Sequence, residues 1–139
     1  MRFWDSSAIL PLLITEADSL ARDQQLTDDP DIIVWFGTLA EIESALARRR
    51  RLGELSPRSE AHARDYLQEI TSHWTEVVPT HEVRARAIRL LRAHPLRAAD
   101  AFQLAAALAF CREHPERLPF LTADQVLRAA AEREGFLVD

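Results

Sequence analysis

The sequence contains no lysine and no asparagine, and all 17 of its basic residues are arginine. Without an ammonium side chain, the chain can carry out neither Schiff-base catalysis nor catalysis by a Ser–Lys dyad, and it has no P-loop lysine. Only three glycines are present (Gly37, Gly53 and Gly135), so there is no glycine-rich loop that could surround a phosphate. These absences exclude lysine-dependent enzymes and P-loop nucleotide hydrolases.

Cysteine and long apolar runs are also scarce. The single cysteine, Cys111, cannot form an internal disulfide and is interpreted as a buried thiol on an apolar helix. The apolar stretch from Ala8 to Ile14 is far shorter than the ~20 residues of a membrane span. Arg2 precedes it, but Asp5 interrupts the pattern and no small-residue cleavage site follows. We therefore expect no signal peptide, no membrane association and a cytoplasmic location.

What is present fits one soluble globular domain covering residues 1–139. Hydrophobic residues make up 47% and charged residues 28% of the chain, and this length can bury a sufficient core without disulfides or a structural metal. The net charge of −5 differs from the basic balance of proteins that coat nucleic acids. Any contact with nucleic acid is therefore expected to be local, with a metal ion in between.

Short apolar runs alternate with helical patterns along the chain. Capping signals mark the predicted helix starts: Asp5 with the serines after it, Thr15, a capping box from Thr38 to Glu41, Ser56 before Pro57, Thr80, and a second box from Thr122 to Gln125. The alternation predicts an α/β fold, a three-layer α/β/α sandwich around a mainly parallel sheet of short strands. The predicted strands cover residues 2–4, 32–35, 75–78, 120–122 and 136–138, and the later helices cover residues 38–52, 80–92 and 96–113.

Acidic residues follow the predicted strands at the edge where open α/β sheets bind ligands. Asp5 follows the first strand, Glu41 lies in the first helical turn after the second, and Asp124 follows the fourth. Each also has a structural interpretation. Asp5 can cap a helix, Glu41 can complete its capping box, and Asp124 can complement a helix dipole.

Asp100 lies in the first turn of an almost entirely apolar helix and could reach the same edge of the sheet. A carboxylate beside such a helix needs a cationic partner or a metal, because burying an unpaired charge is costly. Arg97 could be that partner, so a structural ion pair remains an alternative at this stage.

Four carboxylates at one place would repel one another unless a cation lies between them. Oxygen ligands without histidine or cysteine favour Mg²⁺, with Mn²⁺ as a substitute, over Zn²⁺. The five histidines (His62, His73, His81, His94 and His114) lack the spacing of metal ligands and are interpreted as surface or capping residues.

Four segments together resemble the PIN-domain ribonucleases, and among them the VapC toxins of bacterial toxin–antitoxin pairs. These segments are Trp4–Ala8, Thr38–Leu46, Leu96–Leu104 and Leu121–Asp124, the last followed by Ala130, Ala131 and Gly135. The resemblance covers the whole chain in order and with similar spacing.

The resemblance implies a Mg²⁺-dependent endoribonuclease with a four-acid site that maps onto Asp5, Glu41, Asp100 and Asp124. It also implies Thr122 as a neighbouring hydroxyl, products with a 5′-phosphate and a 3′-hydroxyl, a homodimer, and a small antitoxin that blocks the acidic pocket. Glu43 lies ~200° around the helix from Glu41, so the two cannot share a face, and Glu41 is the predicted ligand.

The Arg48–Arg51 run complements the dipole at the C-terminal end of the helix that Glu41 begins. Arg48 lies seven residues after Glu41, on nearly the same face, and could follow an RNA backbone toward the metal.

Two other classes of protein do not fit the sequence, and one alternative function remains. A phosphoacceptor receiver domain also gathers acids at strand ends but requires a lysine that this chain lacks. A phosphatase acting on small esters would need a two-aspartate nucleophile pattern that is missing. The remaining alternative is a catalytically degenerate PIN-like module whose acidic pocket only holds a partner protein.

Overall fold

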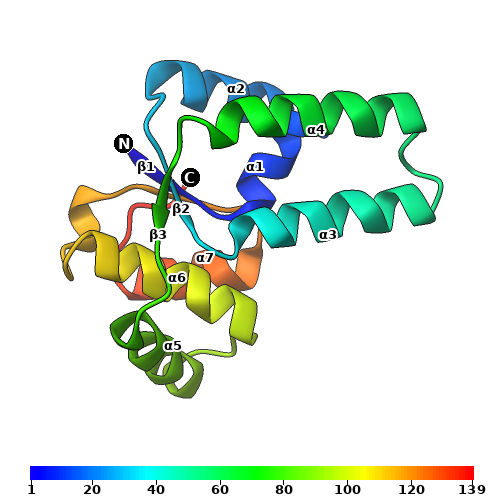
Figure 1. Cartoon of the computed structure of the whole chain (residues 1–139). Coiled ribbons are helices and arrows are strands. Elements are labelled where there is room, and N and C mark those ends of the chain that lie inside the picture. Colours follow the sequence, from blue (N-terminus) through cyan, green and yellow to red (C-terminus); the bar gives the residue numbers. More distant parts are fainter.

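The computed structural model describes all 139 residues and has a four-stranded parallel sheet at its centre (Figure 1). The strands are β1 (Arg2–Trp4), β2 (Ile32–Trp35), β3 (Thr75–Val77) and β4 (Phe120–Leu121). The helices are α1 (Ser6–Leu13), α2 (Ser19–Asp28), α3 (Thr38–Arg51), α4 (Pro57–Thr71), α5 (His81–Ala93), α6 (Ala98–Phe110) and α7 (Gln125–Arg133), with a 3₁₀ turn at Pro115–Arg117. None of these helices has the length and apolarity needed to cross a membrane.

The strand order β3-β2-β1-β4 places a topological switch point between β1 and β4. From β1 to β3 the chain adds each strand on the same side, and it then returns to place β4 on the other side of β1. Phe3 is paired with Ile33 of β2 and with Phe120 of β4, in parallel register on both sides. Ligands of open α/β sheets bind beyond the carboxyl ends of the strands at such a point.

Alternating strand residues supply two separate hydrophobic cores, one on each face of the sheet. Phe3, Ile33 and Phe120 pack with buried residues of α5, α6 and α7, whereas Trp4 and Leu121 pack with those of α1, α3 and α4. Because successive side chains of a strand point to opposite faces, strands buried on both sides are apolar throughout. The three-layer α/β/α fold predicted from the sequence is thereby confirmed.

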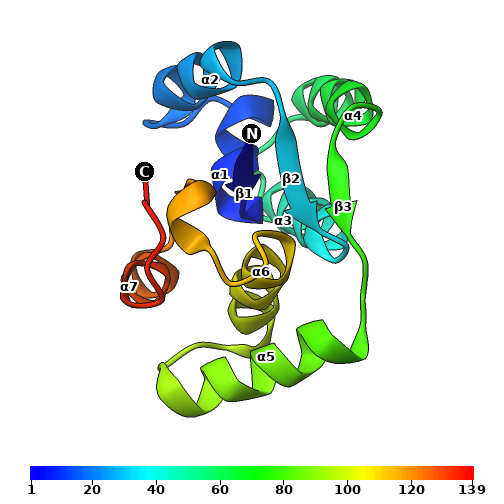
Figure 2. The same ribbon diagram turned by 90° about the vertical axis from the view of Figure 1, so that its left-hand side faces the viewer.

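The two helical layers differ in shape. Helices α3 and α4 form an antiparallel pair that extends away from the sheet (Figure 1). On the other face, α6 lies against the sheet and α5 covers α6 from outside (Figure 2). The predicted all-round apolarity of α6 is confirmed, since six of its apolar residues are buried there: Ala101, Leu104, Ala105, Ala106, Ala107 and Leu108.

Several predicted helix ends are confirmed by their hydrogen bonds. The side chains of Ser56 and Thr80 accept bonds from the backbone N–H groups at the starts of α4 and α5. Gly53, just after α3, and Gly135, just after α7, have φ values of 75° and 96°. This left-handed conformation favours glycine, which explains why both helices end where the sequence predicted.

Three capping predictions are wrong. Gly37, not Thr38, is the N-cap residue of α3, because the Thr38 side chain turns inward to a buried partner on α6. Asp124, not Thr122, caps α7, because the Thr122 hydroxyl bonds to Asp5. Helix α2 begins at Ser19 rather than after Thr15, since the Ser19 hydroxyl closes the preceding turn onto the carbonyl groups of Pro11 and Ile14.

Two element lengths also differ from expectation. Helix α6 begins at Ala98 and ends at Phe110, and Arg112 and Glu113 then adopt φ values of 52° and 62°, which cannot continue a right-handed helix. The predicted last strand at 136–138 is reduced to a single bridge between Val138 and Phe120.

Candidate functional site

Asp5 lies directly after β1 at the switch point and is 4% exposed. Its carboxylate accepts hydrogen bonds from the hydroxyls of Ser7, Thr122 (3.0 Å) and Ser6 (3.3 Å), and from the Ser7 backbone N–H, which makes Asp5 the N-cap of α1. Burial raises its pKa despite these bonds, and the charge of Glu41 raises it further. Helix capping and membership of an acidic site therefore coexist at this residue.

Glu41, in the first turn of α3, is joined to Asp5 through one hydroxyl. The Ser6 hydroxyl lies 2.8 Å from Glu41 Oε2 and 3.3 Å from Asp5 Oδ1. A second donor, Gln103 Nε2 on α6, lies 3.0 Å from the same Glu41 oxygen. Three elements, α1, α3 and α6, therefore hold this carboxylate at the carboxyl edge of the sheet.

The two glutamates of α3 face different surroundings. Glu43 Oε2 lies 3.0 Å from Arg64 Nε on α4, in a half-exposed salt bridge. Glu41 instead lies beside Asp5, as the ~200° between the two positions requires. Glu43 therefore belongs to the α3–α4 contact and not to the acidic cluster.

Asp100 and Asp124 line a common cavity of about 470 Å³, together with Pro95, Arg97, Ala99 and Val126. Asp124 uses Oδ1 to accept bonds of 2.8 Å from the backbone N–H groups of Val126 and Leu127 at the start of α7. Asp124 therefore interacts with the start of α7 as predicted, through direct hydrogen bonds to its backbone. The second carboxylate oxygen of Asp124, Oδ2, is left for other ligands.

The electrostatics link the two halves of the cluster. The pKa of Asp100 is raised first by burial and then by the charges of Asp124 and Asp5. Arg97 lowers that pKa only in part and is absent from the salt bridges of the molecule. The proposed Asp100–Arg97 ion pair is therefore wrong, and none of the four acids has a cationic side-chain partner.

Hydroxyl groups connect the ends of β1 and β4. Thr122 is fully buried; its Oγ1 donates to Asp5 and accepts from the Asp124 backbone N–H at 3.0 Å. Ser7 Oγ lies 3.2 Å from Thr122 Oγ1 and accepts from the Ala123 N–H. The buried side chain of Arg22 on α2 donates a hydrogen bond to the Thr122 carbonyl oxygen. The turn that carries Asp124 is therefore tied to Asp5 by side-chain bonds.

Sequence reasoning missed three polar residues of this site, Ser6, Ser7 and Gln103. The two serines follow Asp5 directly and were interpreted only as helix-starting residues. Gln103 is the only polar residue between Ala101 and Leu108 in an apolar helix, and that isolation was a usable signal. A buried polar side chain needs a hydrogen-bond partner, which predicts a polar group opposite it.

Arg48 is exposed on α3, two turns after Glu41 and so about 10 Å along the helix axis. Its neighbours are engaged elsewhere, because Arg49 pairs with Glu16 and Arg50 with Glu60. Arg48 makes no salt bridge and lines a small cavity with Leu10 and Glu54. It is a free guanidinium on the helix that begins at the acidic cluster.

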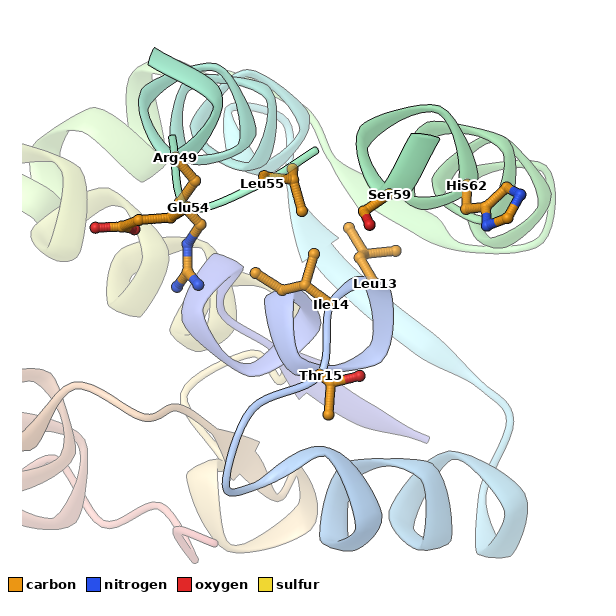
Figure 3. A pocket seen from close by; sticks show the side chains of 8 residues that line it. All are labelled: Leu13, Ile14, Thr15, Arg49, Glu54, Leu55, Ser59 and His62. Carbon is orange, nitrogen blue, oxygen red and sulfur yellow. The ribbon is translucent and has the colours of Figure 1, made fainter. Parts of the chain in front are cut away.

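Another cavity, of about 370 Å³, lies away from the acids, between the end of α1, the α3–α4 connection and the start of α4 (Figure 3). Leu13, Ile14 and Leu55 form its apolar part, and Arg49, Ser59 and His62 are among its polar residues. None of the four acids lines it. It offers no cluster of catalytic groups, so the chemistry is assigned to the edge of the sheet.

The acids gather at one edge as two coupled pairs, Asp5 with Glu41 and Asp100 with Asp124. No three acidic, histidine or cysteine side chains lie close enough to one another to hold a metal ion as they stand. Burial is the main cause of the raised pKa values of Asp5 and Asp100, and repulsion by neighbouring carboxylates raises them further. The donor set is oxygen only and none of the four acids forms a salt bridge, so its chemistry fits a hard divalent cation.

Solved structures with the same fold include proteins of toxin–antitoxin systems. A toxin–antitoxin complex from Klebsiella pneumoniae has a chain 18% identical to this one, with a TM-score of 0.61, covering 89% of this chain and 87% of that chain. A protein from Pyrobaculum aerophilum is 20% identical, with a TM-score of 0.70 and coverage of 99% and 89%. VapBC2 from Rickettsia felis, bound to a DNA fragment from its promoter, is 12% identical, with a TM-score of 0.64 and coverage of 99% and 96%.

At these identities the likeness shows a common fold. No curated protein matches the sequence. A family model, in contrast, matches residues 2–133, which include all four acids and every strand of the sheet. The chain therefore belongs to the PIN domain family.

Proposed function

We propose that this protein is a Mg²⁺-dependent endoribonuclease and the toxin of a type II toxin–antitoxin system. The observation that carries the proposal is the set of four acids without cationic partners at the β1/β4 switch point of a PIN domain. The PIN domain family consists of nucleases, which supports hydrolysis of a phosphodiester. The toxin–antitoxin origin of two structural relatives supports the cellular role.

Asp5 and Asp100 are the proposed first ligands of the cation, and Glu41 and Asp124 complete the site directly or through water. A bound Mg²⁺ would act as a Lewis acid at the scissile phosphate and make water a usable nucleophile near neutral pH. Ser6, Ser7 and Thr122 orient the carboxylates of Asp5 and Glu41 through their hydroxyls. Their bonds leave the carboxylates little rotational freedom, so little ordering is required when substrate binds.

Arg48 is the proposed contact to the RNA backbone beyond the scissile bond. It is exposed, free of acidic partners and on the same helix as Glu41. Its guanidinium can bind phosphate oxygens in a bidentate manner, whereas the net charge of −5 opposes binding elsewhere on the surface. This arrangement supports local contact with RNA.

The second candidate function is a degenerate PIN module that uses its acidic pocket to hold a partner. All four acids and Thr122 are present in the site, which favours the nuclease.

Cleavage of RNA separates the two functions. Purified protein is expected to cut single-stranded or looped RNA with Mg²⁺ or Mn²⁺, to stop in excess EDTA, and to turn over slowly with Ca²⁺, whose looser coordination positions water poorly. Asp100→Asn is the matched inactive control, since it removes the charge and keeps the shape. Cleavage that persists in EDTA, or that Asp100→Asn retains, would contradict the nuclease proposal.

A small antitoxin is the proposed protein partner, and growth arrest is the expected effect of the free toxin. Expression of the wild type in bacteria should arrest growth, and expression of Asp100→Asn should not. A short neighbouring gene that encodes a DNA-binding protein, and whose product relieves the arrest, would identify the partner. Equal toxicity of the variant would contradict a nuclease toxin.

A homodimer is the proposed assembly. Helix α5 exposes Ile88 and Leu91, and Val78 and Phe36 lie exposed near its N-terminal end, at 59% and 54%. Large apolar side chains exposed on one helix and beside its start are a candidate contact surface. Light scattering after size exclusion should give a dimer for the wild type and a monomer for Ile88→Glu with Leu91→Glu. A wild-type monomer at micromolar concentration would remove the dimer and leave the chemistry unaffected.

A further inference from the structure

Gln103 is a buried polar residue in the most apolar helix of the protein. It lies on α6, has no exposed surface, and is surrounded in the sequence by alanine, leucine and phenylalanine. Burying an amide without hydrogen bonds destabilises the folded state, and an apolar residue would avoid that penalty. A purely structural position in this helix would therefore favour leucine or methionine.

The Gln103 amide makes two kinds of contact. Its Nε2 donates to Glu41 Oε2 and to Thr38 Oγ1, both at 3.0 Å. The Thr38 hydroxyl also lies 3.3 Å from Gln103 Oε1. Thr38 is fully buried too, so these two residues form a closed polar pair whose only other partner is Glu41.

Only one orientation of the Gln103 side-chain amide is compatible with its contact to Glu41. Rotating it by half a turn would place its carbonyl oxygen against the Glu41 carboxylate, and two acceptors at that distance repel. Thr38 holds the amide from the other side and can serve as donor or acceptor. The N–H of Gln103 is thereby aimed at Glu41 before any ligand binds.

Glu41 needs such support more than the other acids do. Asp5 and Asp124 are short side chains already fixed by helix capping, whereas a glutamate has three rotatable bonds. Ser6 and Gln103 contact the same Glu41 oxygen, Oε2, which leaves Oε1 free to bind another ligand.

We propose that Gln103 is a positioning residue that, supported by Thr38, holds the Glu41 carboxylate toward Asp5 so that its free oxygen completes the cation site. This inference rests on the proposed nuclease function, and it assigns Gln103 no contact with RNA or with the metal. The alternative is that Gln103 and Thr38 only fasten α3 to α6, in which case their effect would not depend on Glu41.

The experiment is a double-mutant cycle on Mn²⁺ affinity, measured by calorimetry with the full chain. Gln103→Met keeps the volume and removes the donor, and it should weaken Mn²⁺ binding by about 10–100-fold, as outer-shell substitutions do. In a Glu41→Gln background the same change should alter affinity less than twofold. An equal loss in both backgrounds would overturn the proposal, because Gln103 would then act through the fold.

Three further variants separate an effect on the cation site from a loss of folding. Thr38→Val removes only the supporting hydroxyl and should reduce Mn²⁺ affinity less than Gln103→Met, whereas Thr38→Ser should restore it. Ile42 is the buried residue next to Glu41 on α3, and Ile42→Val removes one methyl group and lowers stability without changing a polar group. This variant should leave Mn²⁺ affinity unchanged. Wild-type affinity in both Gln103→Met and Thr38→Val would overturn the proposal.

Failure of the nuclease function gives a different result. If the wild type binds Mn²⁺ but cleaves no RNA, the proposed function is wrong and the cycle still decides the role of Gln103. If RNA is cleaved while Gln103→Met binds Mn²⁺ like the wild type, the positioning role alone is wrong. Absence of Mn²⁺ binding by the wild type would overturn both.

Discussion

Asp100 shows how a single side chain distinguishes a reactive site from a structural ion pair. Its carboxyl is partly buried, lines the same cavity as Asp124 and has no salt bridge. Its raised pKa means that the folded state disfavours the charged form, so the residue opposes folding at neutral pH. A structural ion pair would have the opposite effect on both the pKa and the stability.

Asp100→Asn is therefore expected to leave the metal-free protein as stable as the wild type or more stable, with a melting temperature up to roughly 4 °C higher. The same variant should lose RNA cleavage. Thermal melts of both proteins in EDTA test the first expectation. A variant that melts several degrees lower in EDTA would identify Asp100 as a stabilising structural residue.

The two glutamates of α3 give a second residue-level test. Glu41→Gln should reduce cleavage by roughly a hundredfold or more, because it removes a charge from the proposed cation site. Glu43→Gln should leave cleavage unchanged and reduce stability by at most about 1 kcal/mol, since its pair with Arg64 is half exposed. Steady-state cleavage rates of both variants test this expectation, and equal losses would show that Glu41 has no special role at the acidic site.

At the scale of elements, the β2–α3 turn sets the direction of the helix that carries Glu41. Gly37 lies in that turn, and a Cβ added there would meet the indole Nε1 of Trp35 at 2.6 Å. The Trp35 ring cannot easily move, because it is 8% exposed and stacked on Phe102 with centroids 5.5 Å apart. A side chain at position 37 must therefore displace the start of α3.

Gly37→Ala should lower both stability, by about 1–3 kcal/mol, and Mn²⁺ affinity, because Glu41 moves with the helix. Gly53→Ala is the matched control at the other end of α3. A Cβ there meets no atom, and only the left-handed φ of 75° is unfavourable, at a cost of about 1–2 kcal/mol. Gly53→Ala should leave metal affinity unchanged; if both variants weaken metal binding equally, the turn does not control the site.

At the scale of the whole molecule, the acidic edge couples stability to cations and to pH. The folded-state pKa values of Asp5 and Asp100 are raised, so the folded protein binds more protons than the unfolded chain. Metal-free stability should therefore increase as the pH falls from neutral toward these folded pKa values. Asp29 and Glu134 have lowered pKa values and act oppositely, but only at more acidic pH.

Mg²⁺ at a hundredfold excess over its dissociation constant should stabilise the wild type by about 2.7 kcal/mol and Asp100→Asn far less. Urea unfolding at neutral and mildly acidic pH, with and without Mg²⁺, measures both effects. The stability difference between wild type and variant isolates the contribution of Asp100. A wild type that neither responds to Mg²⁺ nor gains stability on mild acidification would show that the acids act independently.

Local sequence determined the elements of this protein because their causes are local. Apolar strands, the Ser56 and Thr80 caps and the left-handed glycines after α3 and α7 depend on residues within one or two turns, and these predictions were confirmed. The order of the acids along the chain likewise predicted Asp5 and Asp124 just after strands and Glu41 in the first turn of the helix that follows a strand. Family resemblance added the roles that spacing alone did not supply.

Only the tertiary structure decided which side chains meet. Thr38 and Thr122 have local capping partners in the sequence, yet both hydroxyls bond to residues more than 60 positions away, on Gln103 and Asp5. Arg97 is close to Asp100 in sequence and does not pair with it. Burial explains these outcomes. Once the sheet and helices exclude water, each enclosed polar group must form a hydrogen bond with a partner that the packing brings within reach. Proximity in the sequence therefore no longer decides which residues pair.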